Sequence, residues 1–264
     1  MKQKLVNIIR RFGLLPLAEQ AAYLRAVWLA RKDNENFLAT NKSFAPPPLW
    51  LLYESSGHAS YRAYDYSGKQ IAAVLHGMIR AHAGPGTKTL LEWGCGPARI
   101  LRQMEMLDQK LTLFGADYNA QSVSWLRQTF PNIHVRQNNL QPPLPFEDGF
   151  FDVVYCLSVF THLSAEMHKV WIDDIERVLK PGGIFIGSFH GEDCIAHLLD
   201  HELRRFEEGE LVVRANVKEG SRLFCAFHPS PYLKDKLLAR FYVLQVMPNP
   251  TQGMAQTLWV AGKK

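Results

Sequence analysis

The feature that most constrains the fold is an alternation of short apolar runs with longer helical patterns between residues 88 and 190. Five apolar runs lie at 88–93, 111–117, 132–138, 150–157 and 183–189. Helical spacing of apolar residues occupies the stretches at 97–109, 119–130 and 164–180. Apolar strands that alternate with helices are typical of a parallel sheet covered by helices on both faces. Right-handed crossover connections then fix how such a sheet is wound.

The C-terminal residues break this alternation. A helix is predicted over 231–240, followed by two strands over 241–247 and 255–262. The segment between these strands, 248–253, is too short for a crossover helix, so the two strands should pair antiparallel. The sequence therefore predicts an α/β, doubly wound, seven-stranded and mostly parallel sheet with an antiparallel last strand.

Residues outside the alternation divide the chain further. Residues 1–67 are predicted to be a helical N-terminal extension or lid, and 68–264 the main domain. Within the extension, one helix is expected near Leu5 to Phe12, a second over 17–39, and irregular structure over 41–67, because three consecutive prolines cannot lie inside a helix. The main domain should open with a helix over 68–83. Residues 191–229 fit no strand–helix repeat and are the candidate substrate cap.

Charge and cysteine usage exclude several classes of protein. The formal net charge is +5, and residues 1–40 carry seven Lys or Arg against three acids, so the remainder is nearly neutral. No basic stripe suits a phosphate backbone, which disfavours nucleic-acid binding. The four cysteines form no CxxC pair, which argues against a disulfide framework. No apolar run approaches the roughly 18–20 residues that span a bilayer, and no signal-peptide pattern opens the chain. We expect a cytoplasmic protein.

The basic residues near the N-terminus allow two interpretations. Lys and Arg side chains in residues 1–13 stand beside apolar residues at helical spacing. Such a helix can lie on an anionic membrane surface as a peripheral contact. It can also dock on the core of the protein or on a second subunit, which is the more common arrangement for an amphipathic helix.

The strongest local signal is a glycine-rich turn, Gly94-Cys95-Gly96, between the first apolar run and the first helix. Its glycines permit a tight turn and close approach of a ligand to the backbone. Asp117 ends the next run, 23 residues after Gly94, where a carboxylate can accept hydrogen bonds from both hydroxyls of a ribose. Dinucleotide-binding enzymes share this turn and acid, and a glycine-rich turn without a ligand is a further alternative.

Residues 88–190 resemble the core of the Rossmann-like, S-adenosylmethionine-dependent methyltransferase superfamily. Glu92 and the two glycines resemble its first motif, with Ala98 in place of a frequent third glycine. Asp117 matches its ribose-binding acid, and Tyr118 matches the neighbour that packs on adenine. The segments 138–146, 151–156 and 179–183 resemble its third motif, its fourth strand and the turn before its fifth strand, all in order. Asn139 stands where the third motif usually has Asp.

The resemblance implies a methyltransferase that uses S-adenosyl-L-methionine and releases S-adenosyl-L-homocysteine. The implied cofactor residues are Glu92, Gly94, Cys95, Gly96, Asp117, Tyr118, Asn139, Leu140, Cys156, Tyr61 and Tyr64. The two tyrosines belong to the segment that, in related enzymes, folds over the methionine end of the cofactor; packing on the core is their alternative role. Metal-dependent relatives place an acid after the fourth strand, where this chain has Cys156-Leu157-Ser158. We therefore expect no metal.

Two histidines are candidates for a general base. His162 follows the fourth strand and His190 follows the fifth, and the carboxyl ends of these strands face the reacting methyl in this fold. For each, packing or capping is the alternative role. We expect transfer to a small-molecule or sugar-type acceptor, at oxygen or nitrogen. The competing functions are a nucleic-acid or protein methyltransferase, an NAD-dependent oxidoreductase on a similar fold, and a non-catalytic module that binds S-adenosylmethionine.

Overall fold

The computed structural model describes residues 15–214, 217–252 and 254–264. The chain divides into two compact units, Met1–Ser67 and Gly68–Lys264, which are taken separately below. The predicted N-terminal helix near Leu5 and the predicted membrane contact of residues 1–13 lie outside the described residues. None of the helices in the described ranges is both long and apolar enough to cross a bilayer.

The first unit contains α2 (Leu15–Thr40), α3 (Leu49–Ser56) and the start of α4 (Tyr61–His82). The predicted helix over 17–39 is confirmed by α2. The prediction of irregular structure over 41–67 is wrong, because α3 and the first turns of α4 lie there. Pro48 precedes α3 as its N-cap, a place where its fixed φ and missing N–H cost nothing.

The early start of α4 depends on a contact that helical spacing cannot reveal. The Asn34 side-chain oxygen accepts a hydrogen bond from the Tyr61 backbone N–H at 2.8 Å, and its amide nitrogen donates to the Ala59 carbonyl at 2.8 Å. Asn34 is buried. A side chain from α2 therefore fixes the first residue of α4, seven residues before the predicted start at Gly68.

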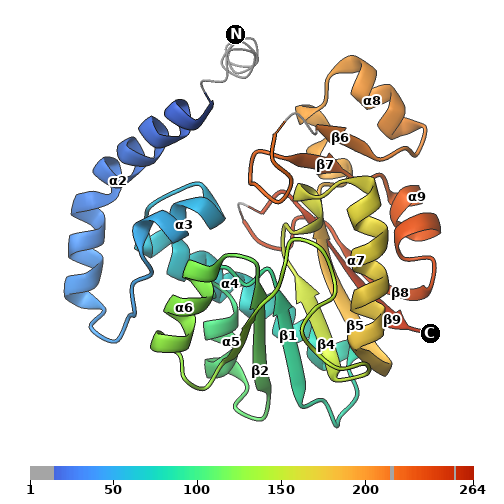
Figure 1. The fold of residues 1–264 in the computed structure, drawn as a ribbon, viewed down its shortest axis with the longest axis horizontal. Helices are drawn as coiled ribbons and strands as arrows, with labels where there is room; N and C mark the ends of the chain where they lie inside the picture. Colours follow the sequence, from blue (N-terminus) through green and yellow to red (C-terminus); the bar gives the residue numbers. More distant parts are fainter. Residues whose placement is uncertain (1–14, 215–216, 253) are drawn as a thin grey trace. The chain divides into compact units, whose positions relative to one another are not determined.

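The second unit is built on a seven-stranded sheet of order β3-β2-β1-β4-β5-β9-β8 (Figure 1). Its strands are β1 (Thr89–Trp93), β2 (Thr112–Asp117), β3 (His134–Gln137), β4 (Phe151–Cys156), β5 (Leu179–Phe189), β8 (Phe241–Met247) and β9 (Thr257–Lys263). The first five strands are parallel, whereas β9 pairs antiparallel with both β5 and β8. The predicted mostly parallel sheet with an antiparallel last strand is confirmed.

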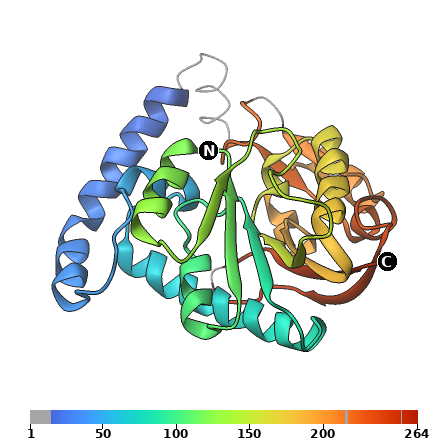
Figure 2. The ribbon, with the colours of Figure 1, turned by 60° about the horizontal axis from the view of Figure 1, so that its bottom comes forward.

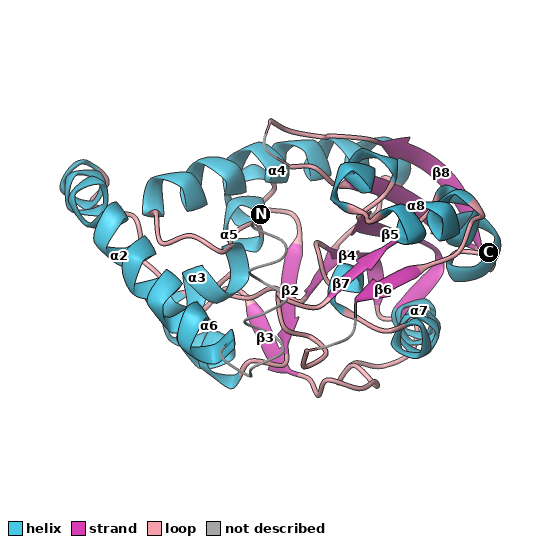
Figure 3. Ribbon diagram, turned by 90° about the horizontal axis from the view of Figure 1, so that it is seen from above, coloured by secondary structure: helices cyan, strands magenta, loops and turns pink. Residues whose placement is uncertain are grey.

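Helices cover both faces of this sheet. One face carries α5 (Leu101–Leu107), α6 (Ala120–Thr129) and the part of α4 after Gly68, and the other carries α7 (Ala165–Val178). Figure 2 shows α5 and α6 in green and α7 in yellow on opposite sides of the strands, and Figure 3 shows the same arrangement from above. Each face has its own buried apolar cluster, as a doubly wound sheet requires.

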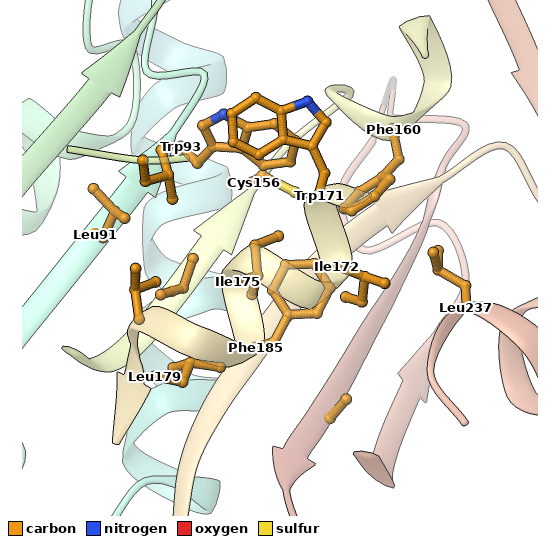
Figure 4. Close-up of a cluster of buried hydrophobic side chains, with 14 of the residues drawn as sticks. Leu91, Trp93, Cys156, Phe160, Trp171, Ile172, Ile175, Leu179, Phe185 and Leu237 are labelled. Carbon is orange, nitrogen blue, oxygen red and sulfur yellow. The ribbon is translucent and has the colours of Figure 1, made fainter. Parts of the chain in front are cut away.

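The cluster under α7 contains a pair of tryptophans (Figure 4). The rings of Trp93 and Trp171 lie 4.4 Å apart between centroids, and both side chains are buried. The Trp171 indole N–H also donates to the Leu140 carbonyl at 3.2 Å. Trp171 therefore connects the core to the loop that follows β3.

Residues 191–229 leave the sheet and return to it. They form the short helix η2 (Glu192–His197), the helix α8 (Asp200–Glu207) and a two-stranded antiparallel sheet of β6 (Val212–Arg214) and β7 (Cys225–Phe227). In Figure 1 these elements lie beyond the end of the sheet at which β4 and β5 finish. The His228 N–H donates to the His190 carbonyl at 2.7 Å, so the insertion is attached directly after β5.

A substitution at Trp171 tests the importance of this packing. Trp171→Ala should lower the free energy of unfolding by about 3–5 kcal/mol, because it leaves a large cavity and removes the hydrogen bond to Leu140. Val170 lies next to it on α7 and is 41% exposed, so Val170→Ala should cost less than about 1 kcal/mol. Urea unfolding followed by fluorescence and circular dichroism measures both; equal losses would contradict this account of the core.

Candidate functional site

The glycine turn and Asp117 meet at the carboxyl ends of β1 and β2. Gly94 and Gly96 have φ angles of 73° and 48°, in the left-handed region that favours glycine. A Cβ on Gly94 would lie 2.4 Å from a methyl carbon of Val159, so any larger side chain would displace Val159 or the turn. The Gly96 N–H donates to Asp117 Oδ2 at 2.7 Å, and the Asn119 N–H donates to Oδ1 at 2.8 Å.

These hydrogen bonds leave Asp117 with capacity for a ligand. The carboxylate accepts from the backbone N–H groups of Gly96, Tyr118 and Asn119, and its two oxygens keep lone-pair capacity beyond these bonds. The side chain is buried, and burial raises its pKa although the backbone donors act in the opposite direction. A carboxylate oriented in this way suits the paired hydroxyls of a ribose.

Glu92 stabilises the turn through two hydrogen bonds. Its Oε2 accepts hydrogen bonds from the Leu101 N–H at 3.0 Å and from the Tyr155 hydroxyl at 2.8 Å. Burial raises the pKa of Glu92 to about 8. The side chain thus fixes the start of α5 and the position of β4 relative to β1, which makes it a positioning residue for the turn.

Cys95 and Cys156 lie close to the same turn and are buried. Burial raises the pKa of both thiols well above the ordinary range. Neither is therefore a thiolate at neutral pH, and both act as small apolar side chains. Ala98 has a φ of 58°, so this position, where the family often has glycine, adopts a backbone conformation that favours glycine.

The two asparagines after β3 differ sharply. Asn139 is exposed, whereas Asn138 is buried. The Asn138 N–H donates to the Asp117 carbonyl at 3.1 Å, and its side-chain nitrogen donates to the Asn139 carbonyl at 2.6 Å. Its Oδ1 is shielded from solvent and has no hydrogen-bond partner among the described residues. A buried acceptor without a partner is costly, so Asn138 is better suited than Asn139 to bind a ligand donor. The assignment of Asn139 from the sequence stays a prediction, and Asn138 stands beside it as the buried alternative.

Tyr118 and Leu140 flank these groups. Tyr118 is 39% exposed and its hydroxyl donates to the Gly220 carbonyl at 3.2 Å.

Tyr61 and Tyr64 belong to the first unit, where Tyr64 is completely buried and the Tyr61 hydroxyl donates to the Pro47 carbonyl at 3.2 Å. The role of these two tyrosines over the cofactor stays a prediction.

His162 has one ring nitrogen fixed by the backbone. Its Nδ1 lies 2.7 Å from the Phe224 carbonyl, so Nδ1 carries the proton and Nε2 has the lone pair of a neutral imidazole. Burial lowers the pKa of this ring, and the charge of Arg222 lowers it further. His162 is therefore neutral at pH 7 with a basic nitrogen available.

His190 is held differently, by a directed set of hydrogen bonds. The hydroxyls of Ser158 and Ser188 both donate to Gln256 Oε1, at 3.0 and 2.6 Å. This orients the Gln256 amide nitrogen toward His190 Nε2, at 3.1 Å. The Nδ1–H of His190 then donates to the Ala226 carbonyl at 3.2 Å, and burial lowers the pKa to about 4. The lone pair on Nε2 is already engaged, so of the two predicted bases His162 is better prepared to accept a proton.

Two further histidines, His168 and His228, have rings that lie close to each other. His168 Nε2 donates to the Phe160 carbonyl at 2.7 Å, and its Nδ1 accepts from the Tyr232 hydroxyl at 3.2 Å. His228 is completely buried, 5.0 Å from the His168 ring between centroids, and neither of its ring nitrogens has a partner among the described residues. No cluster of three or more His, Cys, Asp or Glu side chains suited to a metal occurs in the described residues.

A glycine turn, a buried acid and an unpartnered amide acceptor lie at the ends of neighbouring parallel strands, the arrangement that a Rossmann-like nucleotide site uses. Residues 91–187 match the family described as "Methyltransferase domain". These residues therefore form a methyltransferase domain of the class I, S-adenosylmethionine-dependent kind.

Individual relatives and solved structures are similar to this chain. A "Probable S-adenosylmethionine-dependent methyltransferase" of Mycolicibacterium smegmatis is 30% identical over 131 residues, 50% of this chain and 49% of that protein. A fatty-acid O-methyltransferase of the same organism is 26% identical over 64% of this chain and 58% of its own length. The chain thus spans about half the length of these relatives. An amino pentose methyltransferase from Micromonospora echinaspora shares the fold, with a TM-score of 0.56, 17% identity, and coverage of 77% of this chain and 94% of that one.

The buried carboxyl of Glu92 should make stability depend on pH. Its pKa is about 8 in the folded protein against about 4.3 in an unfolded chain. The folded state therefore binds this proton more tightly, and its contribution to stability falls as pH rises toward 8. Relative to Glu92→Gln, which keeps the hydrogen-bond acceptor, wild type should lose about 2 kcal/mol between pH 6.5 and pH 8. Urea unfolding at both pH values measures this, and parallel profiles for the two proteins would contradict it.

The neighbouring asparagines allow a matched comparison. Asn138→Ala should weaken binding of S-adenosylhomocysteine about tenfold, because a ligand donor loses its buried acceptor. Asn139→Ala, one residue further along and exposed, should change the affinity by less than about threefold. Titration calorimetry measures both; a larger effect at Asn139 would restore the original assignment of the third motif.

Proposed function

We propose that this protein transfers a methyl group from S-adenosylmethionine to oxygen or nitrogen of a small-molecule acceptor. The observation that carries the proposal is the junction at which the Gly96 N–H binds Asp117 Oδ2 at 2.7 Å, with the unpartnered Asn138 Oδ1 at the next strand end. The residues present fit the cofactor, because the site offers acceptors for its ribose hydroxyls and its adenine amine. The glycines let the backbone lie close to the ligand.

Each residue has a separate role in binding. Asp117 accepts hydrogen bonds from the ribose hydroxyls, and Asn138 accepts from the exocyclic amine of adenine. Tyr118 presents its ring beside the base, while Leu140 supplies an apolar contact. Glu92 holds the glycine turn in place relative to β4 through its hydrogen bond to Tyr155. These assignments use only hydrogen-bonding capacity and position at the strand ends.

When bound, S-adenosylmethionine supplies a methyl group that its positively charged sulfur has already activated. The acceptor oxygen or nitrogen forms a bond to the methyl carbon as the carbon–sulfur bond breaks, and the sulfur keeps that electron pair. Much of the rate enhancement comes from holding the acceptor in line with the methyl group. For a hydroxyl acceptor, His162 Nε2 takes the released proton, while its Nδ1–H stays bound to the Phe224 carbonyl.

Two observations favour a small acceptor: the distribution of charge in the chain and the acceptors for which similar proteins are named. The chain has no basic stripe for a nucleic-acid backbone. One relative is named for fatty-acid O-methylation and one solved structure for methylation of an amino pentose. The neutral imidazoles of His162 and His190 suit an uncharged hydroxyl or amine as the group that approaches the methyl.

Release of S-adenosylhomocysteine from the full chain tests this function directly. A panel of fatty acids, amino sugars, hydroxylated aromatic compounds and amines should contain acceptors that support turnover, each identified by mass spectrometry of a product heavier by one methylene. Transfer RNA and protein substrates should give no turnover above background. Turnover confined to transfer RNA or protein would overturn the proposed acceptor class.

The assignment of His162 as the base makes a kinetic prediction for a hydroxyl acceptor found in that panel. His162→Gln should lower kcat about 100- to 1,000-fold, because the proton loses its acceptor in the transition state. Since burial lowers the pKa of His162 below its usual value, wild-type kcat should stay level above about pH 6.5 and fall only in more acidic solution. His190→Gln should cost less than about tenfold. A reversed order of the two variants would assign the base to His190.

A further inference from the structure

A short segment of the 191–229 insertion contacts residues that follow β2, β3 and β4. We call residues 218–224 the strap. The Gly220 carbonyl accepts a hydrogen bond from the Tyr118 hydroxyl at 3.2 Å, and the Gly220 N–H donates to the His162 carbonyl at 2.9 Å. The Phe224 carbonyl accepts from His162 Nδ1 at 2.7 Å. The strap is therefore attached to the residue after β2 and to the turn after β4.

A fourth contact places the strap against the loop after β3. Gly220 has a φ of 79°, and a Cβ built on it would lie 2.7 Å from a methyl carbon of Leu140. No larger side chain fits there without displacing Leu140 or the strap. The strap thus rests on Tyr118 and Leu140, two residues expected beside the cofactor, and on His162, the proposed base.

The strap also carries a polar group without a protein partner. The Ser221 hydroxyl oxygen is shielded from solvent, and no described residue hydrogen-bonds to it. It follows Gly220 directly and is held in a turn by the hydrogen bond from the Ser221 N–H to the Lys218 carbonyl at 3.2 Å. A shielded hydroxyl without a partner is costly, which points to a ligand atom as its missing partner.

We propose that the strap is the outer wall of the cofactor site: it closes over bound S-adenosylmethionine or S-adenosylhomocysteine, and Ser221 hydrogen-bonds to the bound ligand. Tyr118 and Gly220 are its positioning residues. The proposal rests on the proposed function, because it assigns the strap to that same site. Ligand exchange then requires the strap to lift, which breaks the hydrogen bonds to Tyr118 and His162.

The same closure prepares the base. The Phe224 carbonyl is the group that keeps the proton on His162 Nδ1 and leaves Nε2 with its lone pair. When the strap lifts, His162 loses this partner. Closure over the cofactor and orientation of the base are therefore one event, so the acceptor meets an ordered base only when the cofactor is retained.

Two glycines of the insertion give a matched test. Gly220→Ala and Gly209→Ala introduce the same methyl at φ angles of 79° and 81°, so they cost the backbone a similar strain. At Gly209 the added carbon would meet Pro231 at 3.5 Å, an ordinary contact. Gly220→Ala should raise the dissociation rate of S-adenosylhomocysteine at least tenfold, measured by surface plasmon resonance on the full chain. Gly209→Ala should stay within about twofold of wild type.

A second variant keeps the test valid if Gly220→Ala does not fold. Tyr118→Phe retains the ring that is expected beside the adenine of the cofactor and removes only the hydroxyl bound to Gly220. It should raise the same dissociation rate about three- to tenfold. In the double variant the effects should not multiply, because both changes release the same strap. Multiplicative effects would mean that the two residues act independently, which overturns the strap as a single closing element.

Hydrogen exchange separates failure of the strap from failure of the proposed function. In wild type, S-adenosylhomocysteine should slow exchange in a peptide covering 218–224 at least fivefold. Binding of the ligand with unchanged strap protection, and with Gly220→Ala and Gly209→Ala dissociating alike, overturns the strap and leaves the cofactor assignment intact. Absence of any binding to folded wild type, seen first by calorimetry, overturns the proposed function and the strap with it.

Discussion

The hydrogen bond from the Gly96 N–H to Asp117 Oδ2 is the interaction on which the rest of the site depends. It joins the turn after β1 to the end of β2, two strands that are neighbours in the sheet. The turn must be built from glycine, since Gly94 and Gly96 both have positive φ angles. Displacing either partner would separate the glycine turn from the acid that is proposed to bind the ribose.

Buried polar contacts below this junction make it rigid. One oxygen of the Glu92 carboxyl, Oε2, accepts hydrogen bonds from the start of α5 and from the Tyr155 hydroxyl of β4. On the other face of the sheet, Trp171 packs on Trp93 and binds the carbonyl of Leu140. The glycine turn is thereby linked to β4, and the loop after β3 is linked to α7. A site whose supporting side chains are buried and hydrogen-bonded holds its geometry before the ligand arrives.

Local sequence patterns predicted the sheet because each strand is a separate apolar run and each helix has its own spacing. They failed where a distant residue decides the local structure. Asn34 starts α4 at Tyr61, which no spacing within 41–67 reveals. β5 begins at Leu179, four residues before the predicted strand, because Leu179 pairs with Phe151 ahead of a register shift.

The candidate site shows the same division. The glycine turn and Asp117 are a local motif at a fixed spacing, and sequence analysis found both. The sequence alone favoured Asn139, whereas burial in the fold favours its neighbour Asn138, a difference that local spacing does not reveal. Local sequence patterns could not predict the strap, since its hydrogen bonds join residues 58 to 102 positions apart. Whether Tyr61 and Tyr64 close the site is likewise decided by geometry that no spacing encodes.

The central claim is that Asp117 anchors the ribose of S-adenosylmethionine or its product. Titration calorimetry with S-adenosylhomocysteine measures this directly on wild type, Asp117→Ala and a control, Asp108→Ala, whose residue precedes the amino end of the same strand. The account predicts binding to wild type and to the control, and a loss of about 2–4 kcal/mol for Asp117→Ala. Folded wild type that does not bind, or equal affinities for all three proteins, would contradict it.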